Sequence, residues 1–165
     1  MAEDYLKLSR EDRLEALGVA ATQSGRPIHL LEKDIWVVWA IDALFSSEFG
    51  KHLVFKGGTS LSKAYDVIGR FSEDVDVTYD VRQLIPELIG NGPSVPRSNS
   101  QADKWRKSID KKLPAWVKDK ALAVINKHIE ATGVDVKVGV EGTNIYIVVR
   151  EERFQSLRLG EAGHR

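Results

Sequence analysis

The chain has 165 residues, with 24 basic and 24 acidic side chains and no net charge at pH 7. Its length allows one domain with a substantial core, and its 42% hydrophobic and 29% charged residues are typical of a globular protein in water. The absence of cysteine excludes disulfides and thiolate chemistry, no apolar run reaches the roughly 20 residues that span a bilayer, and the N-terminus has no signal-peptide pattern. We therefore expect a single cytoplasmic domain over residues 1–165, outside the membrane and without a global basic field for nucleic acid.

Two helices are predicted before residue 50. Apolar residues recur among charges over residues 9–23, with Ser9 as the N-cap. Residues 30–45 carry an almost continuous apolar surface, and the length of this segment favours a buried helix.

A short strand and a glycine turn are predicted next. The apolar run at residues 52–56 is closed by Gly57 and Gly58, which is typical of a buried strand that enters a tight turn. Thr59 or Ser60 can cap the helix expected after the turn.

Residues 74–79 alternate between polar and apolar side chains, as in a strand with one buried face. Val75 and Val77 lie on one side of this predicted strand, and Asp74 and Asp76 project from the other.

The second half of the chain supplies further elements. Residues 90–100 have the composition of a loop, and residues 104–129 are predicted to be helical with an interruption near Pro114. A hairpin is predicted over residues 134–149, and residues 151–165 show no pattern and are expected to form an irregular tail. Together these elements predict an α+β fold, in which a small mixed sheet is flanked by helices.

The glycine turn is suited to phosphate. Glycines let the backbone turn sharply and approach a ligand, and the free amides at the start of the next helix favour an anion. A glycine pair also occurs in ordinary connections, so this feature alone favours a structural interpretation, and the spacing is not that of a P-loop.

The two aspartates add a second chemical feature. Two residues apart on a strand, Asp74 and Asp76 share a face and can hold Mg²⁺ or Mn²⁺, which prefer oxygen ligands together with substrate phosphates. The alternative is an edge strand with an acidic, solvated face.

The order of a Gly-Gly turn, a helix and an Asp-hydrophobic-Asp-hydrophobic strand resembles the DNA polymerase beta-like nucleotidyltransferase superfamily. More narrowly, the segment Phe-Lys-Gly-Gly-Thr-Ser-Leu-Ser-Lys-Ala-Tyr at 55–65, with Ile-Gly-Arg-Phe-Ser-Glu-Asp-Val-Asp-Val at 68–77, is similar to the AbiEii/AbiGii toxin family. The Glu-Lys-Asp-Ile-Trp segment at 32–36 also resembles that family's helix before the first strand.

This resemblance implies a bacterial toxin of a toxin–antitoxin or abortive-infection system that transfers a nucleotidyl group from a nucleoside triphosphate (NTP), with tRNA as one acceptor and a cognate antitoxin as a partner. It also implies roles for particular residues. Asp74 and Asp76 would be the catalytic metal ligands, and the nucleotide would be bound by Gly57, Gly58, Thr59, Ser60, Lys63 and Arg70.

The family pattern has further parts that this sequence does not match. They are a third carboxylate on a later strand, a downstream lysine and a further acid. Asp135 could stand in for the third acid, although a solvent-facing aspartate is the favoured interpretation. The sequence is therefore expected to lack the family's C-terminal part, and the alternative function is that of a non-catalytic remnant that binds nucleotide or an antitoxin. Transfer to a small molecule or a protein is a third alternative.

Eight basic residues lie between Lys104 and Lys127, with Trp105 and Trp116 among them. They could contact an RNA backbone and stack a base, but an amphipathic core helix with a solvated basic face is the favoured interpretation. The four histidines have no metal-ligand spacing.

Overall fold

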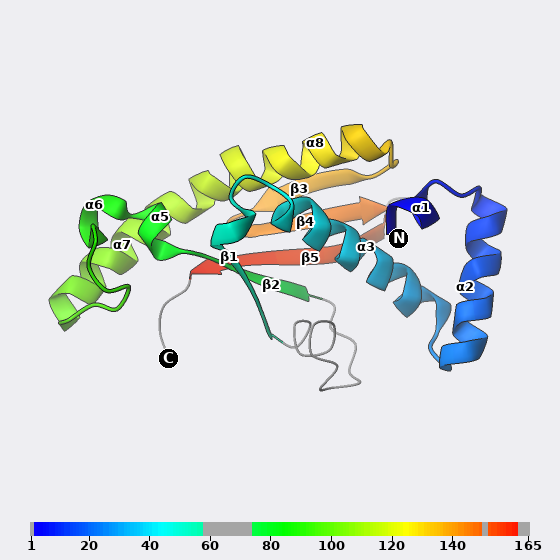
Figure 1. The fold of residues 1–165 in the computed structure, drawn as a ribbon, viewed down its shortest axis with the longest axis horizontal. Helices are drawn as coiled ribbons and strands as arrows, with labels where there is room; N and C mark the ends of the chain where they lie inside the picture. The colour runs from blue at the N-terminus through cyan, green and yellow to red at the C-terminus, as the bar shows by residue number, and fades with distance from the viewer. Residues whose placement is uncertain (1, 58–73, 150–151, 162–165) are drawn as a thin grey trace.

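The computed structural model describes residues 2–57, 74–149 and 152–161, which form an α+β fold (Figure 1). The helices are α1 (Ala2–Leu6), α2 (Arg10–Ser24), α3 (Ile28–Phe45), α5 (Val81–Leu84), α6 (Pro86–Ile89), α7 (Asn99–Trp116) and α8 (Leu122–Thr132), with a 3₁₀ turn η1 (Gly50–His52) and a π turn η2 (Val117–Ala121). The strands are β1 (Leu53–Lys56), β2 (Asp74–Tyr79), β3 (Lys137–Glu141), β4 (Asn144–Val149) and β5 (Glu152–Glu161). The predicted fold class is confirmed.

Helix α2 begins and ends at residues that suit these positions. The Ser9 hydroxyl accepts a hydrogen bond from the backbone N–H of Asp12 at 3.1 Å, which satisfies one of the free amides of the first turn. Gly25 follows the last turn with φ at 68°, a left-handed conformation that glycine adopts without strain. Both predicted N-terminal helices are confirmed to within two residues.

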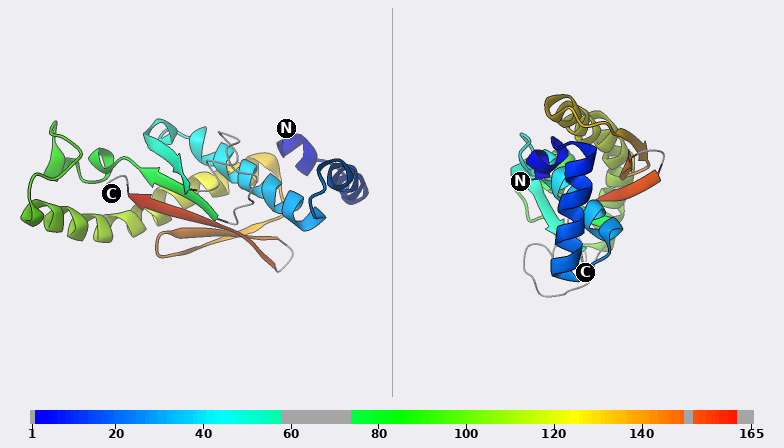
Figure 2. Two further views of the ribbon diagram at one scale, coloured as in Figure 1. Left: turned by 90° about the horizontal axis from the view of Figure 1, so that it is seen from below. Right: turned by 90° about the vertical axis from the view of Figure 1, so that its right-hand side faces the viewer.

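The strands form one mixed sheet in the order β1-β2-β5-β4-β3. Strand β5 runs parallel to β2, and the other neighbouring pairs are antiparallel. Figure 2 shows β5 between β2 and the β3–β4 hairpin. The last described strand in the sequence is therefore the central strand of the sheet.

The prediction of an irregular tail over residues 151–165 is wrong for residues 152–161, which form β5. A central strand with one polar face needs apolar residues only at every second position, so the apolar run that marks a fully buried strand is absent. A register shift between Ile147 and Val148 on β4 also interrupts the pairing with β5, and such a bulge breaks the alternation.

Helices cover one face of the sheet. The side chains of Val75, Val77, Ile145 and Ile147 are almost fully buried on this face, and they belong to the same core as α3, α7 and α8. In Figure 1, α8 runs above the strands and α3 crosses in front of them. The largest fully buried side chains include Trp39, Leu44, Ile125 and Leu159.

The predicted interruption of the long helix takes the form of a π turn. Helix α7 passes through Pro114, and η2 then connects it to α8 without a break in the chain direction. Proline lacks the N–H that an interior helical position donates, and single π turns occur as bulges within α-helices. Ser98 caps α7 by accepting a hydrogen bond from the N–H of Gln101, so the helix begins earlier than predicted.

The helix predicted between the glycine turn and β2 lies outside the described residues. Among the helices that are described, none combines the length and apolar character required to cross a bilayer.

Candidate nucleotide site

The second face of the sheet, here called the polar face, carries the predicted aspartates. Its register positions are Lys56 on β1, Asp74 and Asp76 on β2, Ser156 and Arg158 on β5, and Asn144 and Tyr146 on β4. Asp76 is half-buried, while its neighbours Val75 and Val77 are buried on the helical side. The alternation of β2 therefore directs its apolar side chains to the core and Asp76 to the polar face, with Asp74 at a register position on the same face.

Gly57 and Asp76 lie in direct contact. Gly57 follows the last residue of β1 and has φ at 75°, a conformation that favours glycine. A Cβ atom added at Gly57 would lie 3.2 Å from both Cβ and Cγ of Asp76 and closer still to its carboxylate. Only a residue without a side chain leaves room for this carboxylate beside the turn.

Basic residues occupy the positions on either side of Asp76. Lys56 is its register partner on β1, and Arg158 is its partner on β5. Lys56 is exposed. Lys56 belongs to the motif quoted from the sequence, but Arg158 was missed because it falls in the segment expected to be irregular. The alternation of Ser156, Leu157, Arg158 and Leu159 is the sequence signal that could have revealed it.

Asp135 does not lie beside the aspartates of β2. It is exposed and precedes β3, the edge strand that is separated from β2 by β4 and β5. The β5 partners of Asp74 and Asp76 are Ser156 and Arg158. Within the described part of the chain, no three His, Asp or Glu side chains form a metal-holding group.

The remaining predicted nucleotide-binding residues, which are Gly58, Thr59, Ser60, Lys63 and Arg70, lie outside the described residues. Of the described residues, Asp74 begins β2 and is the register partner of Ser156. The side chain of Asp76 lies against Gly57, so the turn after β1 and strand β2 are adjacent. Carboxylate oxygens two residues apart on one face are donors of the type that Mg²⁺ takes, so the donor chemistry fits this metal.

Asp80, directly after β2, has a structural role. Its carboxylate accepts a hydrogen bond from the backbone N–H of Arg82 at 2.9 Å and so caps α5. The Arg82 guanidinium donates to both carboxylate oxygens, at 2.8 to 3.1 Å, and these hydrogen bonds hold the pKa of Asp80 below its usual value. This acid is therefore engaged in local structure at the end of the strand.

Aromatic packing fixes the end of β2. The ring of Tyr79 stacks on that of Trp116 with centroids 4.1 Å apart, and Phe49 contacts both rings edge-on. Burial raises the pKa of the Tyr79 hydroxyl, which stays protonated at neutral pH. Trp105 is buried and Trp116 is packed in this cluster, so the core-helix interpretation of the basic segment fits both tryptophans.

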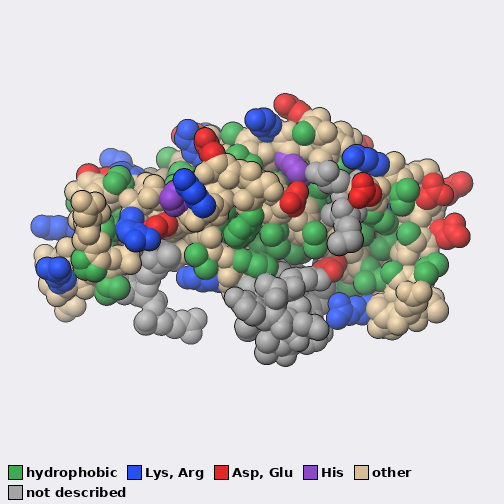
Figure 3. All heavy atoms as spheres, viewed as in Figure 1, with side chains coloured by type: hydrophobic (Ala, Val, Ile, Leu, Met, Phe, Trp, Pro, Cys, Tyr) green, Lys and Arg blue, Asp and Glu red, His purple; other side chains and the backbone are tan. Residues whose placement is uncertain are grey.

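The charges of the basic segment are dispersed. Lys104, Lys107, Lys111 and Lys118 are exposed, and Lys112 forms an ion pair with Glu87 at 2.7 Å. On the face shown in Figure 3, basic side chains are spread over the surface with acidic side chains between them.

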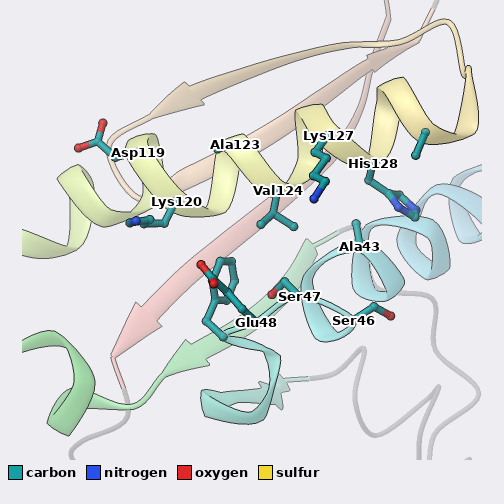
Figure 4. A pocket seen from close by; sticks show the side chains of 12 residues that line it. Ala43, Ser46, Ser47, Glu48, Asp119, Lys120, Ala123, Val124, Lys127 and His128 are labelled. Atoms are coloured by element: carbon teal, nitrogen blue, oxygen red, sulfur yellow. The ribbon is translucent and has the colours of Figure 1, made fainter.

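A separate pocket of about 580 Å³ lies on the helical side of the molecule, between the end of α3 and α8 (Figure 4). Ser46, Ser47 and Glu48 face Lys127 and His128 across it. None of the sequence-predicted site residues lines this pocket. It is therefore distinct from the polar face that carries Asp76.

The structure thus combines an α+β fold with a glycine turn against an Asp-x-Asp strand, as the resemblance to the nucleotidyltransferase superfamily implies. A family model described as "Nucleotidyl transferase AbiEii toxin, Type IV TA system" matches residues 39–159, which include β1 to β4 and most of β5. The chain belongs to this family of nucleotidyltransferase toxins of type IV toxin–antitoxin systems. No curated protein and no solved structure matches the chain.

Proposed function

We propose that this chain transfers a nucleotidyl group from an NTP to the hydroxyl of an acceptor. The observation that carries the proposal is the contact between the Asp76 carboxylate and the Gly57 turn. A phosphate-binding turn and a metal-binding acid must adjoin for this chemistry, because the metal has to reach the phosphates that the turn holds. Membership of the AbiEii family supports the same reaction.

The residues of the proposed site would bind either the triphosphate or the metal. Gly57, with Gly58, Thr59 and Ser60, would hold the triphosphate through backbone amides and hydroxyls, and Lys63 and Arg70 would add positive charge. Asp74 and Asp76 would hold Mg²⁺ or Mn²⁺, which supplies charge neutralisation at the phosphates when bound. The acceptor oxygen forms a bond to the α-phosphorus, the bond from that phosphorus to pyrophosphate breaks, and the acceptor proton is released.

The proposed acceptor is tRNA, because the family resemblance implies this class. The balanced charge and dispersed lysines do not supply a single basic surface on the face shown in Figure 3, so RNA contacts would be local. A cognate antitoxin protein is the proposed partner, and the cytoplasm is the proposed location.

The second candidate function is nucleotide binding without transfer. The register position next to Asp76 on β5 favours this candidate, because it is held by Arg158 and not by the third carboxylate that the family resemblance implies on a later strand. An arginine there would attract the triphosphate without adding a metal ligand.

One experiment measures both the binding of NTP to the protein and the transfer of its nucleotidyl group to tRNA. Each α-labelled NTP is mixed with the purified protein, Mg²⁺ and total tRNA, and both bound and transferred label are measured. Asp76→Asn should lose both signals, whereas Lys127→Ala in the helical-side pocket should keep them. Binding without transfer to tRNA, protein or small-molecule pools would select the second candidate. Label transfer that survives Asp76→Asn would contradict the proposal.

A further inference from the structure

Lys56 is the last residue of β1 and lies beside Asp76 on the polar face. The two residues are register partners of β1 and β2, so their Cβ atoms lie about 5 Å apart on one face of the sheet. Lys56 also directly precedes Gly57, which lies against the Asp76 carboxylate. One lysine thus adjoins both described parts of the proposed site. It is not among the nucleotide-binding residues that the family resemblance implies.

The polar face is open to solvent at β1. This strand is at the edge of the sheet, where it pairs with β2. Leu53 is buried on the helical side, whereas Val54, two residues before Lys56 and on the same face as it, is 52% exposed. Lys56 is exposed as well. A ligand that approaches the polar face can therefore reach this lysine.

The ammonium group of Lys56 has no partner within the described part of the chain. Arg82, Arg106 and Lys112 form ion pairs with nearby acids, but Lys56 forms neither an ion pair nor a side-chain hydrogen bond with any described residue. This holds even for Asp76, its neighbour across the strands. The three N–H donors of Lys56 are therefore available to another acceptor.

The proposed ligand carries charge that a lysine at this position would offset. An NTP is more negative than one Mg²⁺ can neutralise, and Asp74 and Asp76 add further negative charge. Ligands of one Mg²⁺ lie about 2 Å from the metal, so a phosphate oxygen that shares the metal with Asp76 lies within about 4 Å of its carboxylate. The long, flexible side chain of Lys56 can reach this region from the neighbouring strand.

We propose that Lys56 binds the triphosphate of the NTP, an inference that rests on the proposed function. Its ammonium group donates charge-assisted hydrogen bonds to phosphate oxygens beside the Gly57 turn. Lysine binds phosphate as a compact point charge, without the fixed geometry that arginine requires. Lys56 therefore contributes affinity for the phosphate groups and does not select the base.

The test measures the affinity for inorganic triphosphate in the presence of Mg²⁺. Calorimetric titrations are made on the wild type, Lys56→Gln, Lys56→Arg and Lys137→Gln. Loss of the cation should raise the Kd about tenfold in Lys56→Gln. Lys56→Arg keeps the charge and should restore most of the affinity.

Lys137 is the matched control. It is exposed, and its register partner Val148 places it on the polar face. It lies on β3, at the opposite edge of the sheet, four strand spacings or about 19 Å from β1. Lys137→Gln should therefore bind triphosphate as the wild type does. An equal loss of affinity in Lys56→Gln and Lys137→Gln would show a general effect of charge and would overturn the inference.

Wild-type affinity for triphosphate in a folded Lys56→Gln protein would also overturn the inference. If the same variant then bound tRNA more weakly, Lys56 would contact the acceptor instead. If Lys56→Gln does not fold, lysine acetylation of the wild type decides. Triphosphate with Mg²⁺ should protect Lys56 and leave Lys137 reactive, and a lack of protection at Lys56 would contradict the inference. Failure of the wild type to bind triphosphate at all would defeat the proposed function as well.

Discussion

At the scale of single residues, the proposed site requires the absence of a side chain at Gly57. Its positive φ and its contact with Asp76 are two separate demands for glycine at one position. Gly25 has a similar φ of 68°, but a Cβ there would meet nothing within 4 Å. A substitution at Gly25 therefore introduces only the strain of the left-handed backbone. A substitution at Gly57 introduces the same strain and also crowds the carboxylate of Asp76.

Replacement of Gly57 by alanine should impair both stability and binding. A left-handed conformation costs a non-glycine residue about 1–2 kcal/mol, and the new methyl would also press on Asp76. Gly25→Ala should lose a similar amount of unfolding free energy while its triphosphate binding stays at the wild-type level. Denaturant unfolding and calorimetric binding measure both quantities, and equal binding by the two variants would contradict this interpretation of Gly57.

Asp80 supplies a prediction about pH. Hydrogen bonds from Arg82 lower the pKa of Asp80 in the folded protein below its value in the unfolded chain. The charged carboxylate therefore stabilises the fold at pH values above the pKa of the unfolded chain, and this contribution is lost as the pH falls through the pKa of the folded protein. Asp80→Ala should cost about 1 kcal/mol at pH 7 through loss of the cap, and Asp80→Asn should cost less because asparagine also caps helices.

The wild type and Asp80→Asn should differ in their free energy of unfolding because only the wild type carries the charge of Asp80. Urea unfolding should show this difference at pH 7 and a smaller one below about pH 4, where a carboxyl begins to protonate. A difference that is the same at both pH values would show that the ion pair with Arg82 does not contribute.

At the scale of elements, the sequence predicted most of the fold. Helices with caps, such as α2, and strands with clear alternation, such as β2, were found close to their observed limits because local signals determine them. Strand β5 was missed since its place in the sheet is set by pairing with β2 and β4, which are distant in sequence from each other. The same reason applies to the candidate site: local motifs predict Gly57 and Asp76, whereas Arg158 takes its position beside Asp76 only through the register of the sheet.

Strand β5 should be essential for stability. Leu159 is about 1% exposed in the core, and its replacement by alanine should lower the unfolding free energy by about 3 kcal/mol. Leu14 on α2 is 52% exposed, so the same substitution there should cost no more than about 0.5 kcal/mol. Chemical denaturation of both variants tests the placement, and similar losses at the two positions would contradict a central β5.

At the scale of the whole molecule, the sheet separates two environments. The helices α3, α7 and α8 bury one face, which leaves the other face for Gly57, Asp76 and Tyr146. The pocket between α3 and α8 belongs to the helical side, so a substitution there and one on the polar face should have independent effects. This separation makes Lys127→Ala a suitable control for the site.

The polar face is proposed to bind an NTP through the turn at Gly57 and the acid at Asp76. The most direct measurement is a calorimetric titration of the four NTPs with Mg²⁺ into the wild type, Asp76→Asn and Lys127→Ala. We predict saturable binding to the wild type and to Lys127→Ala, and at least a tenfold weaker affinity in Asp76→Asn because a charged metal ligand is lost. Equal affinity of the wild type and Asp76→Asn for every NTP would contradict the account.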